Sequence, residues 1–283
     1  MMCAVASAAA PVRFRPMGLG ELLDESFKLY RRHFGIMAGL SLLIAIPNLV
    51  FGILAGPVLS NPITALQQAT QNNPNPELTT IREPLTQLAS FLLIYGLVSL
   101  LLSPITTGTL YRASTTLALG REETIQSALL ATLRRYFGVL GQTLIFYLVA
   151  ASMGLVITIP VAIWVLGRWI TRLPALFAEQ LGPVNALGRS WALVRDNWWR
   201  SVGVFVVLII LQWIAGLAIG TALGVLAVVI PGGEVLRSSV TNALSTLGGA
   251  FVQPIVAIGI TLLYFDLRVR KEGFDLEQLA RQA

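Results

Sequence analysis

The sequence predicts an all-α integral membrane protein with six transmembrane helices, arranged as three hairpins that are each preceded by a cytoplasmic amphipathic interfacial helix. Composition is the first observation behind this prediction. The 283 residues are 55% hydrophobic and only 12% charged, with a mean hydropathy of +0.74, which is too apolar for a soluble domain of this size. The second is a set of apolar stretches long enough to cross a bilayer, and the third is a basic, aromatic segment that recurs before three of them.

Charge and rare residues exclude several classes of function. The net charge of +6 comes from basic residues beside apolar stretches, where they act as topology signals and contacts for anionic lipid, so we expect no nucleic-acid partner. Cys3 and His33 are the single cysteine and histidine, which leaves no internal disulfide and no imidazole cluster for a metal, and no cofactor is expected. Residues 1–16 are small and basic without a secretory apolar run, and we interpret them as a disordered cytoplasmic lead.

Six apolar segments are candidate spans, because a bilayer core of about 30 Å needs roughly 20 helical residues. They form a single membrane domain over residues 17–266, followed by a cytoplasmic tail at 267–283. The polar, turn-rich stretch 56–87 is expected outside, with short surface helices near 63–68 and 78–85. The predicted spans are 35–55, 88–111, 138–158, 161–179, 202–230 and 243–265.

The fourth segment carries Arg168 and Arg172, which makes its insertion doubtful. Two arginines near a helix centre cost roughly 5 to 7 kcal/mol, whereas its eight strongly apolar residues return only about 2.4 to 4.8 kcal/mol. The distribution of positive charge favours insertion nevertheless. Six spans with both termini inside place sixteen lysines and arginines in the cytoplasm and only Arg82 and Arg237 outside, whereas five spans divide them ten to ten.

The recurring basic, aromatic segment predicts three interfacial helices and three repeat units, at 17–111, 122–180 and 183–266. Leu23, Phe27, Tyr30 and Phe34 form one helical stripe, which recurs 164 residues later as Leu187, Trp191, Val194 and Trp198, while the second copy is looser. The simpler alternative is that these helices only orient the spans. The anchor residues are Phe27, Tyr30, Arg31, Arg32, Phe34, Arg134, Arg135, Tyr136, Phe137, Trp191, Arg195, Trp198, Trp199 and Arg200.

Prolines and glycines within the spans predict how the helices pack. Pro104, Pro174 and Pro254 lie in the second helix of each hairpin, where proline bends the helix axis for packing or to open a cavity. Gly216, Gly220 and Gly224 form a small-residue face that allows another helix to approach closely, within the bundle or in a partner.

Arg168 and Arg172 are the candidate ligand site, because they lie one turn apart on one predicted helix face. Guanidinium groups bind phosphate oxygens bidentately, so the pair predicts a site for an anionic lipid headgroup or a substrate phosphate. In the alternative interpretation, Arg172 extends to the cytoplasmic interface and Arg168 pairs with a helix carbonyl or with a carboxylate such as Glu179.

Enzyme chemistry is not expected from this sequence. Nearly all fourteen acidic residues lie in loops or interfacial helices, interleaved with bases. There is no Gly-rich phosphate loop and no Gly-x-Ser-x-Gly elbow, and general acid and base catalysis has no paired residues at an evident site.

Three stretches carry a family resemblance that covers essentially the whole chain. The chain resembles the glycerophosphoryl diester phosphodiesterase membrane domain in residues 15–32, 186–200 and 263–276. The first stretch begins Arg-Pro-Met-Gly-Leu-Gly-Glu, and the last includes Tyr264-Phe265-Asp266-Leu267-Arg268. The resemblance implies a membrane location and a helical fold. The catalytic domain to which some members are fused is absent here, so the resemblance implies no catalytic residue.

Two functions from different classes follow. The first is a non-enzymatic membrane scaffold or accessory subunit that contacts anionic lipids and other membrane proteins. The alternative is a lipid-handling or small-solute transport protein that binds an anionic group at Arg168 and Arg172. A regulatory anchor for a separate phosphodiesterase is a third possibility, by family analogy alone. A bacterial plasma membrane with both termini cytoplasmic is the expected location.

Overall fold

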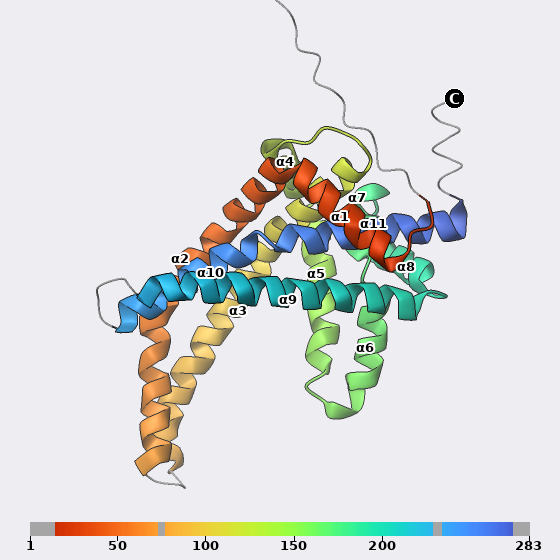
Figure 1. The fold of residues 1–283 in the computed structure, drawn as a ribbon. Coiled ribbons are helices and arrows are strands. Elements are labelled where there is room, and N and C mark those ends of the chain that lie inside the picture. The colour runs from red at the N-terminus through yellow and green to blue at the C-terminus, as the bar shows by residue number, and fades with distance from the viewer. Residues whose placement is uncertain (1–14, 73–76, 229–233, 274–283) are drawn as a thin grey trace, which may run out of the picture.

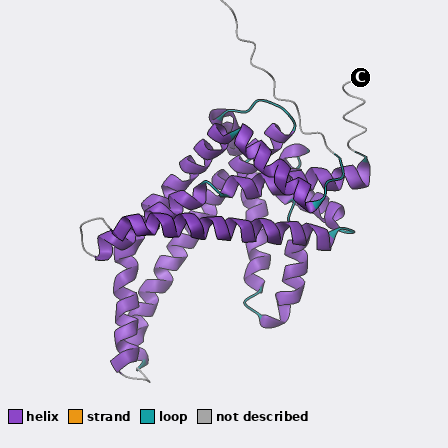
Figure 2. Cartoon of the chain, viewed as in Figure 1, coloured by secondary structure: helices purple, strands orange, loops and turns teal. Residues whose placement is uncertain are grey.

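The computed structural model describes residues 15–72, 77–228 and 234–273. The predicted lead at 1–16 and the tail at 267–283 therefore lie mostly outside the described residues. Within the described part, the regular structure is helical and contains no strand (Figure 2), which confirms the predicted all-α class.

The long helices form three consecutive antiparallel hairpins, and a shorter helix precedes each hairpin (Figure 1). Helix breaks follow α6 and α10, so the second and third hairpins each end in an additional helix. In chain order the elements are α1 (Leu19–Arg32), α2 (Phe34–Asn72), α3 (Leu78–Ala118), α4 (Ile125–Arg134), α5 (Tyr136–Ser152), a 3₁₀ turn (Val156–Thr158), α6 (Ile159–Arg168), α7 (Arg172–Ala178), α8 (Pro183–Val194), α9 (Trp198–Val228), α10 (Glu234–Ala250) and α11 (Gln253–Glu272).

Four helical segments of the described chain are long and apolar enough to cross a membrane: Thr79–Ala118, Ile159–Ala178, Trp198–Ala222 and Leu244–Glu272. Helix α1 and the first part of α2, Phe34–Pro47, meet at a bend of 86°. If these two helices are counted as one broken span, there is a fifth candidate. Helix α5 is apolar but has only 17 residues, about 26 Å at 1.5 Å per residue. The structure thus supports four to five of the six predicted spans.

The connections of the first two hairpins differ from each other. Helix α2 extends to Asn72 and α3 begins at Leu78, so the short helices predicted near 63–68 and 78–85 are parts of two long helices, and the turn-rich character predicted for the rest of 56–87 is wrong for most of its length. The placement of this stretch outside the membrane stays a prediction. The α5–α6 connection is tight, and Pro160 occupies the first turn of α6, where its missing N–H costs no hydrogen bond. Figure 1 shows that α9 runs across the direction of α5 and α6, so the third hairpin is not parallel to the second.

Helix α11 is the centre of the protein. In the 18-residue stretch that marks its segment as a candidate span, 67% of residues are buried within the protein, compared with 6% in the corresponding stretch of α3 and 11% in that of α9. It contacts α1, α3, α7, α8 and α9, and Leu262, Tyr264 and Phe265 on it are fully buried. Because lipid is the expected surroundings of α3 and α9, α11 is the helix that the other elements enclose.

Gly259 allows α9 and α11 to pack closely. A Cβ atom at this position would lie 2.7 Å from both terminal methyl groups of Leu208, which is itself buried on α9. We expect Gly259→Ala to destabilise the protein by about 1 to 2 kcal/mol, because an extra methyl group overpacks this contact. Thermal unfolding in detergent, followed by tryptophan fluorescence, measures the effect. Gly216→Ala is the control, since nothing lies within 4 Å of that position, and equal losses in both variants would contradict the prediction.

Helix α1 lies against α11 through one face. Its N-terminus is closed by the Glu21 carboxylate, which accepts a hydrogen bond of 2.8 Å from the Gly18 N–H. Leu22, Ser26 and Leu29 are buried, whereas Phe27 is 42% exposed. The predicted stripe is therefore split: Tyr30 turns inward and donates a hydrogen bond of 2.7 Å to the Phe251 carbonyl, while Phe27 and Phe34 face outward.

Candidate functional site

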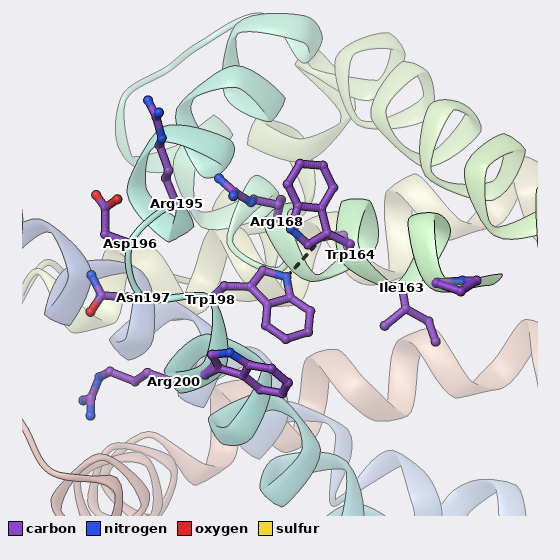
Figure 3. Close-up of a pocket in the computed structure, with 10 residues that line it drawn as sticks. Ile163, Trp164, Arg168, Arg195, Asp196, Asn197, Trp198 and Arg200 are labelled. Carbon is purple, nitrogen blue, oxygen red and sulfur yellow. Dashed lines mark hydrogen bonds between the residues drawn. The ribbon is translucent and has the colours of Figure 1, made fainter. Parts of the chain in front are cut away.

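A cavity of about 690 Å³ lies where α6, the α8–α9 connection and the start of α9 meet (Figure 3). Three arginines, three tryptophans, Asp196 and Asn197 provide most of its wall. The tryptophans are Trp164 on α6 and Trp198 and Trp199 on α9, and Trp199 is 82% exposed. The cavity combines positive charge with aromatic rings, as sites at a membrane interface do.

Arg168, the last residue of α6, is held between two aromatic rings. Its guanidinium carbon lies 4.6 Å from the centre of the Trp164 ring and 4.9 Å from that of Trp191 on α8. Cation–π contacts of this kind hold the charge in place without neutralising it. Its Nε is buried and unbonded, and within the described part of the chain Arg168 forms no salt bridge, although it interacts electrostatically with Asp196. Glu179, the carboxylate considered as its partner, pairs with Arg189.

Ser190 on α8 fixes the end of α6. Its hydroxyl donates a hydrogen bond of 2.8 Å to the carbonyl of Arg168, one of the carbonyls that a helix C-terminus leaves without an intrahelical partner. The Thr171 and Ser190 hydroxyls are 2.9 Å apart, and since Ser190 has given its proton to Arg168, Thr171 is the donor. Both side chains are fully buried. Helix α8 therefore sets the position of the Arg168 side chain.

The other charged groups around the cavity differ in how far they are neutralised. Asp196 accepts a hydrogen bond of 2.7 Å from the Lys271 ammonium group, which lowers the pKa of Asp196 below its usual value. Arg200 is turned toward Asp266, with its Nη2 2.9 Å from the carboxylate. Arg195 is exposed and extends away from Trp198 in Figure 3. Arg168 and Arg195 interact electrostatically with Asp196, but no salt bridge of either arginine is formed within the described structure.

Arg172 does not join Arg168 in one site, contrary to the predicted spacing on one helix face. Helix α6 ends at Arg168 and α7 begins at Arg172, so a turn separates the two residues. Arg172 lines a second cavity, of about 430 Å³, and its guanidinium carbon lies 3.9 Å from the centre of the Phe146 ring on α5. The arginine pair is thus two separate positions, and anion binding at either stays a prediction.

A buried ion-pair cluster around Asp266 is the feature that sequence reasoning missed. Asp266 on α11 has a fully buried side chain and accepts hydrogen bonds from the Met17 N–H at 2.8 Å, from Arg200 at 2.9 Å and from Arg270 at 3.0 Å. Both arginines also donate to the Met17 carbonyl. The signal was present in the sequence, because these residues occur in the stretches that carry the family resemblance.

A second cluster, around Glu179, joins α7, α8 and α11. The Glu179 carboxylate accepts a hydrogen bond of 2.6 Å from the Tyr264 hydroxyl and one of 2.8 Å from Nε of Arg189. Arg189 also donates to Glu272, and the hydrogen bonds to Glu272 and then Glu179 raise the pKa of Arg189 above its usual value. Arg268 completes the cluster through Glu272, at 3.1 Å.

The remaining predicted residues lie in varied surroundings. Arg31, Arg32, Arg134 and Phe137 are exposed, and Phe137 is 83% exposed. Arg135 and Tyr136 instead donate hydrogen bonds to carbonyls, Arg135 to Leu181 at 3.2 Å and Tyr136 to Leu101 at 2.9 Å.

The small-residue face on α9 is used within the third hairpin. A Cβ atom on Gly220 would lie 3.4 Å from the Ser245 hydroxyl oxygen, and one on Gly224 would lie 3.6 Å from Thr241. Gly216 has nothing within 4 Å. Two of the three glycines therefore face α10, and the third is open.

Long apolar helices with exposed apolar side chains define a helical integral membrane protein. Residues 142–279, from α5 past the end of α11, match the family described as the membrane domain of glycerophosphoryl diester phosphodiesterase. The resemblance read from the sequence is thereby confirmed over this region, and the match includes no catalytic domain. Searches of the curated proteins and of the solved structures gave no match.

Proposed function

We propose that this protein is a non-enzymatic, lipid-binding membrane protein that holds an anionic phospholipid headgroup at Arg168. The observation that carries the proposal is a cation held between Trp164 and Trp191, facing a cavity, with its Nε unbonded and no salt bridge within the described structure. A lipid phosphate satisfies such a guanidinium through paired N–H to oxygen hydrogen bonds. Tryptophan side chains prefer the headgroup layer, where the ring is partly apolar and partly hydrated.

We further propose that all six predicted segments span, with α1, α4 and α8 at the cytoplasmic interface of a bacterial plasma membrane. An exposed aromatic residue occurs within the first two positions of each following helix: Phe34 on α2, Phe137 on α5 and Trp199 on α9. This regularity supports one interfacial level for the three hairpin entries. Since α9 runs across α5 and α6, the third hairpin then crosses the bilayer at a different tilt from the second.

A scaffold or accessory subunit is the second candidate function. It rests on the outer face of α9, where Trp213, Ile214 and Leu217 are 76%, 60% and 69% exposed beside the open Gly216. A small residue flanked by large apolar ones allows close approach of a partner helix. The same apolar side chains would also be satisfied by contact with lipid, so this face does not require a protein partner. We therefore prefer the proposal of lipid binding at Arg168.

Native mass spectrometry of protein purified gently, without delipidation, tests the lipid proposal. We expect the natural sequence to retain one anionic phospholipid per chain and Arg168→Met to lower its occupancy at least tenfold, because the substitution removes the cation that the two tryptophan rings hold in the cavity wall. Arg134→Met is the matched control, since Arg134 is exposed and lines neither cavity.

Thermal unfolding accompanies the experiment, because losing two cation–π contacts costs about 1 to 2 kcal/mol of stability. Equal lipid occupancy in Arg168→Met and the natural sequence would overturn the proposal. Protein partners that remain bound in all forms, with no stoichiometric lipid, would instead support the scaffold.

A further inference from the structure

The second cavity, the one that Arg172 lines, adjoins the headgroup cavity, and Ile163 lines both. It has a volume of about 430 Å³ and lies between α3, α5, α6 and α9. Gly167 lines it and packs directly against Trp198, which lines the first cavity, so this close contact between α6 and α9 lies between the two. The wall is apolar apart from Arg172, Tyr111 and Thr107.

Arg172 is poorly satisfied in this setting. Its Nε is buried without a hydrogen-bond partner, and its Nη1 makes only one long contact, 3.4 Å, with the Trp169 carbonyl. Within the described residues it forms no ion pair, and the ring of Phe146 provides a further contact, with its centre 3.9 Å from the guanidinium carbon. Burying a cation beside apolar walls costs free energy unless an anion is bound next to it. A bound anion would therefore stabilise Arg172 at this position.

The cavity is open toward the outer apolar surface. Ile163 and Val206 line it from α6 and α9 and are 47% and 45% exposed, on helices that are candidate membrane spans. An acyl chain in the bilayer therefore has a lateral entry between these two helices. The volume lies in the lower part of the range of about 300 to 1,000 Å³ typical of small-molecule sites, which favours one chain over two.

We propose that this cavity binds a single-chain amphiphile, with its anionic head, a carboxylate or a phosphate, on Arg172 and its chain along Ile170, Phe205 and Val206. The ligand class is thus a fatty acid or a lysophospholipid. This site goes beyond the proposed headgroup site, because it uses a different arginine and a different cavity. One cation supplies the head contact, and the apolar wall supplies most of the contact with the chain.

Binding of oleate and of 1-oleoyl lysophosphatidate to the full chain in mild detergent, in separate titrations by native mass spectrometry, tests this proposal. We expect saturable binding of one molecule per chain for at least one probe, and the tighter probe identifies the head. Arg172→Met keeps an unbranched apolar stem without the charge and should weaken binding at least tenfold, whereas Arg172→Lys should retain part of it. Val206→Trp blocks the cavity without touching a charge and should also abolish binding.

Arg168→Met separates this site from the headgroup site, because it should leave the affinity for the single-chain probe unchanged while releasing phospholipid. Unfolding midpoints of all variants show that the fold is retained. The proposal is overturned if neither probe saturates, or if Arg172→Met and Val206→Trp bind both probes as the natural sequence does. Loss of phospholipid in Arg168→Met bears only on the first site.

Discussion

Replacing Asp266 by alanine should lower the free energy of unfolding by about 3 kcal/mol, the largest stability effect that we expect in this protein. Its fully buried carboxylate accepts from Arg200, Arg270 and the Met17 N–H. Removing it leaves two arginines facing each other and a backbone donor without its partner. Because both arginines are partly exposed, at 25% and 32%, water recovers part of the loss, and we expect the lower end of the range for buried pairs.

Thermal and SDS-induced unfolding in detergent, followed by tryptophan fluorescence, measure this loss. Asp266→Asn should be nearly as damaging, because the amide retains the shape but not the charge that both arginines require. Asp196→Ala is the matched control, since its ion pair with Lys271 also reaches α11 but the Asp196 side chain is 70% exposed, and its midpoint should barely change. Similar midpoints for Asp266→Ala and Asp196→Ala would show that the buried cluster contributes little.

The second large effect is expected at Glu179, where alanine should cost about 2 to 3 kcal/mol. The buried Tyr264 hydroxyl loses its acceptor, 2.6 Å away, and Arg189 loses one of its two carboxylate partners. Glu272 stays available to Arg189 and Arg268, which limits the loss. The cluster ties α7 and α8 to α11, so the variant should loosen this end of the protein.

A double-mutant cycle with Tyr264→Phe isolates the hydrogen bond. The phenylalanine keeps the packed ring and removes the donor, so alone it should cost only about 1 kcal/mol. In the double variant, Glu179→Ala should then cost about 1 kcal/mol less than it does in the natural sequence, because the unsatisfied hydroxyl is gone. Strict additivity of the two substitutions would mean that the Tyr264 hydroxyl is not the group that depends on Glu179.

Much of the fold was predictable because its signals are local. Runs of about 20 apolar residues report bilayer spans, and Pro160 and Pro183 mark the beginnings of α6 and α8. The three shorter helices before the hairpins were predicted for the same reason, since a 3.6-residue period needs only the neighbouring turns. The extent of α2 and α3 was missed because polar, turn-rich composition weighs against helix, whereas the two helices support each other in contact.

The candidate site was less predictable. Arg168 and Arg172 were predicted as one site because an ideal helix places them on one face, but a turn held by Thr171 and Ser190 separates them into two cavities. The Trp191 side chain against Arg168 comes from another helix, which no local pattern reports.

The sequence by itself determined the class of protein, the order of the helices and the residues of the family stretches, because composition and periodicity act over a few neighbouring turns. Only the tertiary structure decided what those residues do. It brought Met17 to Asp266 across 249 positions, gathered Glu179, Arg189 and Glu272 into one cluster, and left Nε of Arg168 and of Arg172 buried without a hydrogen bond. Whether two charged residues far apart in the chain form an ion pair depends on how whole helices pack. That packing is determined jointly by all the contacts around α11.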